Sequence, residues 1–197
     1  MNNRAKKCGI SADVQAKVDS KYDEALASEG LQWIHDVLEK HGDPQEFDVS
    51  GNRANFESVL SDGYLLAKLI SVLNPGSISP NKLSKRPTMT FKKMELIEMF
   101  LSNIKTYGVP DHELFATIDL TEAQNLNQVV VCLQGLGRKA RANGEIGFGP
   151  QESQANVRTF TEEQLNAGNS VISLQYGSNK GASQAGMSFG KSRKILD

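Results

Sequence analysis

The amino-acid sequence predicts an all-α fold with four principal helices, several short helices and a mostly irregular C-terminal tail. Apolar residues recur every three to four positions in four stretches between residues 24 and 143, which is the period of an amphipathic helix. The chain does not alternate strands with helices, so no sheet is expected. Residues 144–158 consist mainly of Gly, Pro, Gln, Ser and Asn, with few large apolar groups. This composition is typical of a linker.

The first principal helix is expected at about residues 24 to 41. Trp33 lies beside its apolar positions, which are Leu31, Ile34, Val37 and Leu38. The sequence His-Gly-Asp-Pro at 41–44 predicts its end, because Gly adopts the left-handed cap and Pro cannot continue a helix. Upstream, Ser11 is expected to cap a small amphipathic turn that contains Val14, Val18 and Tyr22.

The second helix is expected after Asp62, with an apolar face so broad that it should be the central helix. The third should begin near Thr88 or Thr90 and end at Gly108. Its apolar residues are Phe91, Met94, Ile97, Leu101 and Ile104. The fourth should open at 121–124, where Thr-Glu-Ala-Gln has the form of a capping box. Residues 161–164, Thr-Glu-Glu-Gln, have the same form and predict one more short helix, ending at Gly168.

Composition argues against several classes of protein. The net charge of −1 does not favour global attraction to nucleic acid or to an anionic membrane. Cys8 and Cys132 form no CxxC pattern and indicate reduced thiols in the cytosol. No stretch approaches the roughly 18 apolar residues of a membrane span, and the first residues do not resemble a signal peptide. A soluble, cytoplasmic protein is therefore expected.

One stretch imitates an enzyme motif. Residues 129–140, VVVCLQGLGRKA, have the form of a strand followed by GxGxxA, as in a dinucleotide-binding turn. That motif needs a second strand ending in an acid about 20 residues on, and the stretch before Glu152 supplies neither helix nor strand. A helix is the preferred interpretation. The three histidines have no metal-ligand spacing, so we expect no catalytic residues, no metal and no cofactor.

Residues 82–93 form a strongly basic segment with no acid. Its cations are Lys82, Lys85, Arg86, Lys92 and Lys93. Residues 43–62, in contrast, contain five acids against Arg53 alone. Such polarisation can steer a domain onto an acidic partner, so this segment is a candidate secondary basic patch. An ordinary solvated loop and helix face is the preferred interpretation.

The C-terminal tail is also cationic and contains regularly spaced glycines. Between Gly177 and Leu196 it has no acid and four cations, namely Lys180, Lys191, Arg193 and Lys194. A few apolar residues, Leu174 and Met187 among them, are candidate anchors. The segment has too little apolar surface to offset the entropy of ordering by itself, so it is expected to gain order against another surface.

Several stretches resemble a calponin-homology domain, and their order and spacing make the resemblance specific. They are Trp33-Ile34, the run LSDGYLLAKLI at 60–70, Asn74-Pro75-Gly76, FKKME at 91–95, YGVP at 107–110, TIDL at 117–120 and Leu136-Gly137-Arg138. Residues 172–187, ISLQYGSNKGASQAGM, resemble one calponin-like repeat. The chain is therefore similar to the calponin and transgelin family over nearly its whole length. Tyr176 departs from the methionine that is usual in the repeat.

The resemblance implies a domain plan: an N-terminal extension at 1–24, a calponin-homology domain at 25–143, a linker with a short helix at 144–170 and a calponin-like repeat at 171–196. It also implies an actin-filament-binding cytoskeletal muscle protein, with Leu174, Lys180, Met187, Lys191, Arg193 and Lys194 as the actin contacts. Ser183 and Ser188 are candidate phosphorylation sites among these lysines. The alternative function is a signalling adaptor whose calponin-homology domain binds another protein.

Overall fold

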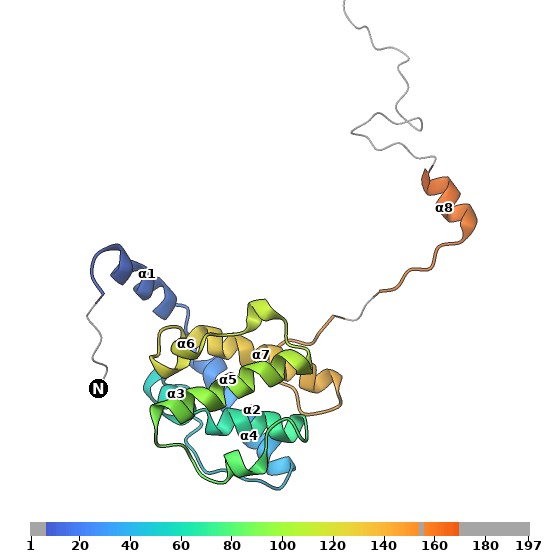
Figure 1. Ribbon diagram of the computed structural model, residues 1–197. Helices are drawn as coiled ribbons and strands as arrows, with labels where there is room; N and C mark the ends of the chain where they lie inside the picture. Colours follow the sequence, from blue (N-terminus) through green and yellow to red (C-terminus); the bar gives the residue numbers. More distant parts are fainter. Residues whose placement is uncertain (1–6, 154–155, 170–197) are drawn as a thin grey trace, which may run out of the picture. The chain divides into compact units, whose positions relative to one another are not determined.

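A computed structural model describes residues 7–153 and 156–169 of the chain. The described residues fall into two units, one ending at Ser153 and one beginning after it. Within these ranges every regular element is helical, as predicted (Figure 1). In chain order they are α1 (Ile10–Asp19), α2 (Glu24–Lys40), α3 (Arg53–Leu60), α4 (Tyr64–Leu73), η1 (Pro80–Leu83), α5 (Thr90–Tyr107), η2 (Asp111–Glu113), α6 (Thr117–Thr121), α7 (Leu126–Ala142) and α8 (Glu162–Asn169).

The core of the first unit is built by α2, α4, α5 and α7, which are the four predicted principal helices. α4 packs against both α2 and α5, and α7 packs against α2 and α6. Seven of the ten α4 residues are buried, which agrees with its predicted central place. Burial of apolar surface stabilises the folded state by about 25 cal/mol per Å². The continuous apolar face of α4 therefore holds this helix between its neighbours. The predicted helix ends at glycine are also confirmed. Gly42 follows α2 and Gly108 follows α5, with φ of 76° and 112°.

The predicted start of the fourth helix is wrong. Thr121 is the last residue of α6, and its hydroxyl donates to the Thr117 carbonyl 3.0 Å away inside that helix. The chain then turns at Ala123, which has a φ of 50°. α7 begins at Leu126, where the Asn125 side chain accepts from the Gln128 N–H at 3.2 Å. Asparagine is as good an N-cap as threonine, and here it alone is in the right place.

One other expected cap also differs. Ser11 lies inside α1, whose N-cap is Gly9, because the helix begins two residues earlier than predicted. α5 begins at Thr90, which agrees with the prediction. Its N-cap is Met89, which makes no side-chain capping hydrogen bond, so the start of this helix is unusual.

The short helix α3 was not expected from the sequence. It buries only Phe56 and Leu60, too few apolar positions for a clear period, and Asn52 caps it through the Ala54 N–H at 2.9 Å. Its first residue, Arg53, also holds the N-terminal extension. Arg53 Nη2 lies 2.8 Å from Asp19 Oδ1 of α1 and thereby ties that helix to the domain.

Part of the expected linker packs onto the helical domain. Phe148 is 5% exposed and its ring stacks on Trp33 of α2, with centroids 5.9 Å apart. The Trp33 Nε1–H donates to the Ile146 carbonyl at 2.7 Å. Glu145 pairs with Lys40 at 2.6 Å, and hydrogen bonds from Lys40 and His41 hold the pKa of Glu145 below its usual value. Residues 145–149 therefore extend the core, which their composition did not reveal.

The described part of the second unit contains α8. Its predicted capping box is present: Thr161 Oγ1 accepts from the Gln164 N–H at 3.4 Å, and Gln164 Oε1 accepts from the Thr161 N–H at 3.1 Å. The helix runs through Gly168 to Asn169 instead of ending at Gly168. Val157, Phe160 and Leu165 are exposed, so this segment buries none of its large apolar side chains.

Candidate functional site

The two predicted binding regions differ in what the structure describes. The tail contacts and both serines lie outside the described residues; they are Leu174, Lys180, Ser183, Met187, Ser188, Lys191, Arg193 and Lys194. The secondary basic patch lies within them, on η1, the loop that follows and the start of α5. All five cations of that patch therefore have described positions and contacts.

The basic segment borders a hollow of about 500 Å³. Its lining includes four of the five predicted cations, while Lys93 does not line it. The lining residues are Asn81, Lys82, Ser84, Lys85, Arg86, Pro87, Thr88, Lys92, Glu95 and Leu96. Four of the five cations thus lie around one hollow, because the loop folds back beside the first turns of α5.

Two of the five cations have acidic partners inside the domain. Lys82 Nζ lies 2.6 Å from Glu95 Oε1 on α5. Arg86 Nη1 lies 3.2 Å from Asp62 Oδ2, and its guanidinium lies 5.2 Å from the centre of the Tyr64 ring. Lys82 and Arg86 therefore help to hold the loop in place.

The other three cations, Lys85, Lys92 and Lys93, have no acidic partner among the residues that the structure describes. The sequence also placed Phe91 and Met94 on the core-facing side of α5, and this is wrong. Phe91 is 76% exposed and Met94 is 38% exposed, whereas Ile97 is fully buried. The helix joins the core only from its second turn. Exposed apolar residues therefore adjoin the lysines, a combination that sequence reasoning missed.

Lys68 interrupts the apolar face of α4 and forms an internal ion pair. Its Nζ lies 2.7 and 2.5 Å from the two Asp43 oxygens, and 5.3 Å from the centre of the Tyr64 ring. Burial works against its charge, but the hydrogen bonds with Asp43 and Tyr64 outweigh it, so the pKa of Lys68 is raised. This pair closes the loop after α2 onto α4 and serves the fold.

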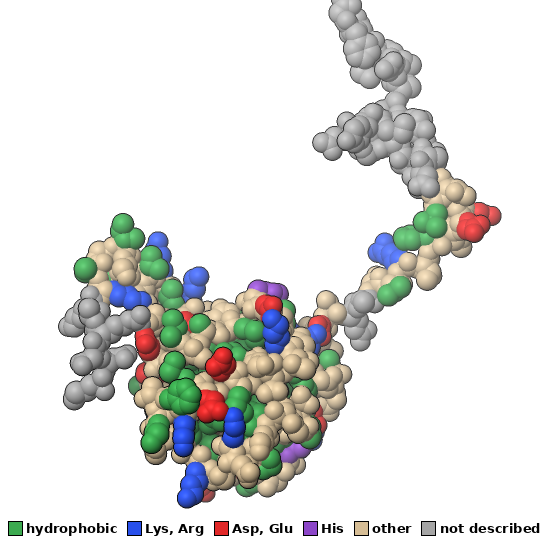
Figure 2. Space-filling view, viewed as in Figure 1, with side chains coloured by type: hydrophobic (Ala, Val, Ile, Leu, Met, Phe, Trp, Pro, Cys, Tyr) green, Lys and Arg blue, Asp and Glu red, His purple; other side chains and the backbone are tan. Residues whose placement is uncertain are grey.

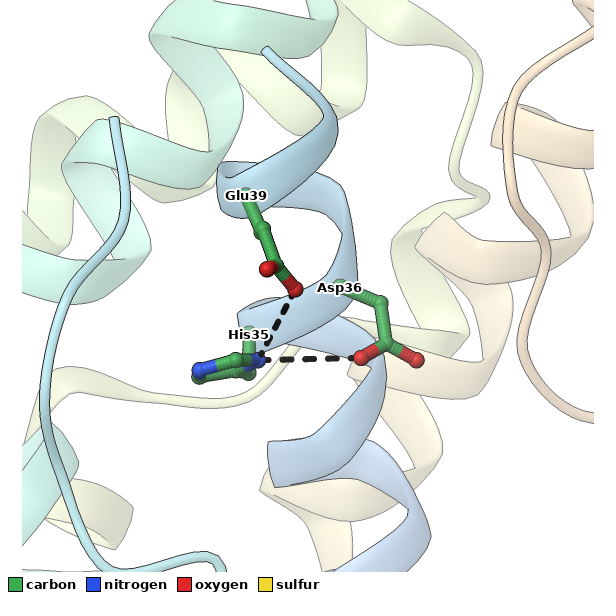
Figure 3. Close-up of side chains that lie close together, drawn as sticks. All are labelled: His35, Asp36 and Glu39. Atoms are coloured by element: carbon green, nitrogen blue, oxygen red, sulfur yellow. Dashed lines mark ion pairs between the residues drawn. The ribbon is translucent and has the colours of Figure 1, made fainter. Parts of the chain in front are cut away.

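One group of side chains has the geometry of a metal site, as Figure 3 shows. His35 Nδ1 lies 3.7 Å from Asp36 Oδ1 and 3.9 Å from Glu39 Oε2, and it has no hydrogen-bond partner. All three residues belong to α2. Asp36 and Glu39 are 43% and 66% exposed, and Asp36 already accepts from Gln32 at 2.8 Å. No fourth ligand joins the group within residues 7–153 and 156–169, and its two acids are largely exposed, so the group supports no metal site.

The stretch that imitates a dinucleotide-binding turn is one continuous helix, α7, as preferred above. Its glycines allow close packing instead of holding phosphates. A Cβ at Gly137 would lie 2.6 Å from the Phe148 carbonyl oxygen, and one at Gly135 would clash with Glu113. Both carboxylate oxygens of Glu113 in turn accept hydrogen bonds from Arg138 Nη2, at 2.5 and 2.6 Å. Small residues are required here by neighbouring chain segments.

Comparison with known proteins completes the description of this chain. The model of the calponin homology (CH) domain matches residues 24–142, and the model of the calponin family repeat matches residues 172–195. Myophilin from Echinococcus granulosus is 40% identical over 200 residues, covering all of both proteins. The chain belongs to the calponin family. It is a calponin-like, actin-associated cytoskeletal protein of the muscle type, and it combines one CH domain with one repeat.

Solved structures share the CH fold. A Vav1 structure with an allosteric inhibitor is 25% identical, with a TM-score of 0.52, over 67% of this chain and 24% of that one. The calponin-homology domain of Rng2 from Schizosaccharomyces pombe is 24% identical, with a TM-score of 0.49, over 77% of this chain and 88% of that one. CH domains and calponin repeats define structural and binding families. Within the described ranges, none of the helices combines the length and apolarity needed to cross a bilayer.

Proposed function

We propose that this protein binds side-on to filamentous actin in the cytoplasm through residues 171–196. The observation that carries the proposal is the match of the calponin family repeat to 172–195, a segment whose cations have no acid among them. Lys180, Lys191, Arg193 and Lys194 meet acidic groups on the filament, while Leu174 and Met187 dock as apolar anchors. Exposed ion pairs contribute only about 0.2–1 kcal/mol each. One repeat therefore binds weakly, and added salt weakens it further.

Co-sedimentation with filamentous actin tests the proposal. Truncation after Asn169 leaves α8 complete and removes the repeat, so the truncated chain should remain in the supernatant while the full chain pellets. Full-length chain with Lys180→Glu and Lys191→Glu should pellet poorly, whereas the matched reversal Lys17→Glu on α1 should pellet normally. Equal pelleting of the full and truncated chains would remove the repeat from the mechanism.

Cross-linking or stabilisation of filaments, and hence modulation of actomyosin contraction, requires a second contact. The secondary basic patch is the candidate, since Lys85, Lys92 and Lys93 are not neutralised by described acids. Low-speed sedimentation detects bundles and high-speed sedimentation detects binding. Lys85→Glu with Lys92→Glu should abolish bundles and leave binding intact. Bundling that survives this change would point to dimerisation instead.

Phosphorylation of Ser183 or Ser188 is proposed as the regulatory step. Each phosphate adds about −1.5 to −2 charge beside the tail lysines and would weaken their attraction to an acidic filament. A Ser183→Glu chain should therefore pellet less than a Ser183→Ala chain at the same ionic strength. Identical binding curves for the two chains would remove Ser183 from the switch.

The second candidate function is a signalling adaptor in which the CH domain binds a protein other than actin. The observation that favours it is the exposed apolar group beside unpaired lysines at the start of α5. Filament binding by the repeat is compatible with this function, because the repeat and the CH domain are different segments. Filament cross-linking through the secondary basic patch would compete with it, because both use Lys85 and Lys92.

A further inference from the structure

Three apolar side chains at the start of α5 remain in solvent. Met89, Phe91 and Met94 are 65%, 76% and 38% exposed. Phe91 and Met94 are three residues apart and therefore lie on neighbouring turns of one side of the helix. Figure 2 shows hydrophobic, cationic and acidic side chains interspersed on the face along which α5 runs. We use the name α5 patch for Lys85, Met89, Phe91, Lys92 and Met94.

The cations of the α5 patch form no ion pairs. Lys85 and Lys92 have no acidic partner in the described ranges. The first turn of α5 contains no acid, and Met89 provides no side-chain cap, so its N–H groups add partial positive charge. The patch thus combines positive potential with apolar contact area, and a fitting partner must supply the opposite charge and an apolar group.

We propose that the α5 patch binds an acidic peptide segment of a partner protein that contains a bulky apolar residue. Its carboxylates meet the ammonium groups of Lys85 and Lys92, and its apolar residue packs against Phe91. The hollow of about 500 Å³, which Lys85 and Lys92 line but Phe91 does not, has room for a further apolar side chain of the peptide, with Leu96 and Pro87 in its wall. The hollow favours a peptide over an anionic membrane, because an apolar side chain of a peptide can enter it.

Nuclear magnetic resonance of the full-length ¹⁵N-labelled chain tests this proposal residue by residue, which separates the α5 patch from the cationic tail. The probe is a synthetic peptide in which glutamates flank a central Phe-Leu pair. Control probes are the same peptide with serines in place of the pair, and vesicles containing phosphatidylserine. Amide signals of residues 85–95 should shift with the first peptide, and added salt should weaken the effect.

Variants of exposed residues separate docking from folding. Phe91→Ser should weaken the peptide about tenfold at the α5 patch, since burial of an aromatic ring is lost. Lys92→Glu should weaken it about fivefold, and both variants should keep the parent's far-ultraviolet circular dichroism. The matched controls Phe160→Ser and Lys17→Glu change an exposed ring and an exposed lysine elsewhere and should leave the affinity unchanged.

Other results would overturn the proposal. These are an absence of shifts in residues 85–95, equal affinity for the peptides with and without the Phe-Leu pair, or equal losses in the patch variants and the controls. Shifts at the α5 patch with vesicles but not with the peptide would assign the surface to a membrane. The result is independent of actin sedimentation, so this proposal and the filament proposal can fail separately.

Discussion

Replacing Phe148 with alanine is expected to destabilise the CH domain substantially. The residue lies outside the predicted domain boundary at 143, yet its ring stacks on Trp33 of α2 with an interplanar angle of 22°. The ring also approaches Gly30 closely, since a Cβ there would lie 3.3 Å from its Cε1 atom. The substitution would remove these contacts and uncover part of Trp33, leaving a cavity between α2 and α7.

The size of the effect follows from the burial of the ring. Replacing a buried phenylalanine with alanine costs about 3–5 kcal/mol. Phe148 packs at the edge of the core and water can fill part of the space, so the lower end, about 3 kcal/mol, is expected. For a domain of this size each kcal/mol lowers Tm by about 2–4 °C, which gives a decrease of about 6–12 °C.

Thermal unfolding of the full-length chain, followed by circular dichroism, measures the change. Phe160→Ala is the matched control, because Phe160 is 58% exposed and its loss should change stability by less than about 0.5 kcal/mol. An equal, small effect of the two substitutions would show that residues 145–149 are only a linker, as their composition suggests. Packing of this segment on Trp33 would then not contribute to stability.

Gly137→Ala should lower the unfolding free energy by about 1–3 kcal/mol in urea denaturation, because the new Cβ would crowd the chain at 148; an unchanged midpoint would contradict that close approach. Burial raises the pKa of Cys132 to about 12, so only Cys8 should react quickly with a thiol reagent near pH 8 until denaturant is added. Two fast thiols in the native chain would contradict this. Asp43→Asn should cost about 1 kcal/mol at neutral pH. Because the folded pKa of Lys68 is raised above 10.5, the parent's advantage is present below that pH and should disappear as the pH rises through the folded value; a pH-independent difference would contradict it.

The principal helices could be predicted because their signals are long and redundant. α4 and α7 bury an apolar residue at almost every helical repeat. Gly42 ends α2 and Gly108 ends α5, and each has the positive φ that favours glycine. The start of α7 could not be predicted from the local pattern. Thr121 and Asn125 are both suitable caps, and only the turn at Ala123 between α6 and α7 decides which of them is used.

The sequence singles out the basic residues of the candidate site, but it does not reveal the exposed apolar residues beside them. Lysines without neighbouring acids are visible in the sequence, whereas their partners are not: Asp62 reaches Arg86 from 24 positions away along the chain. Phe91 and Met94 continue the helical period of Ile97, so periodicity assigned them to the core. Phe91 and Met94 nevertheless remain exposed at the start of α5, and their exposure depends on tertiary structure alone.

The start of α5 departs from what helix stability would select. Lys92 and Lys93 lie in the first turn, where the helix dipole makes a cation unfavourable, and an acid there would stabilise the helix by about 0.3–1 kcal/mol. A serine or aspartate in place of Met89 would add about 1 kcal/mol through capping. Phe91, exposed beside them, contributes little to folding. Three such departures within five consecutive residues are difficult to explain by folding and are expected at a surface that is selected for binding. On this reasoning, substitutions that stabilise the start of α5 should weaken the proposed peptide contact.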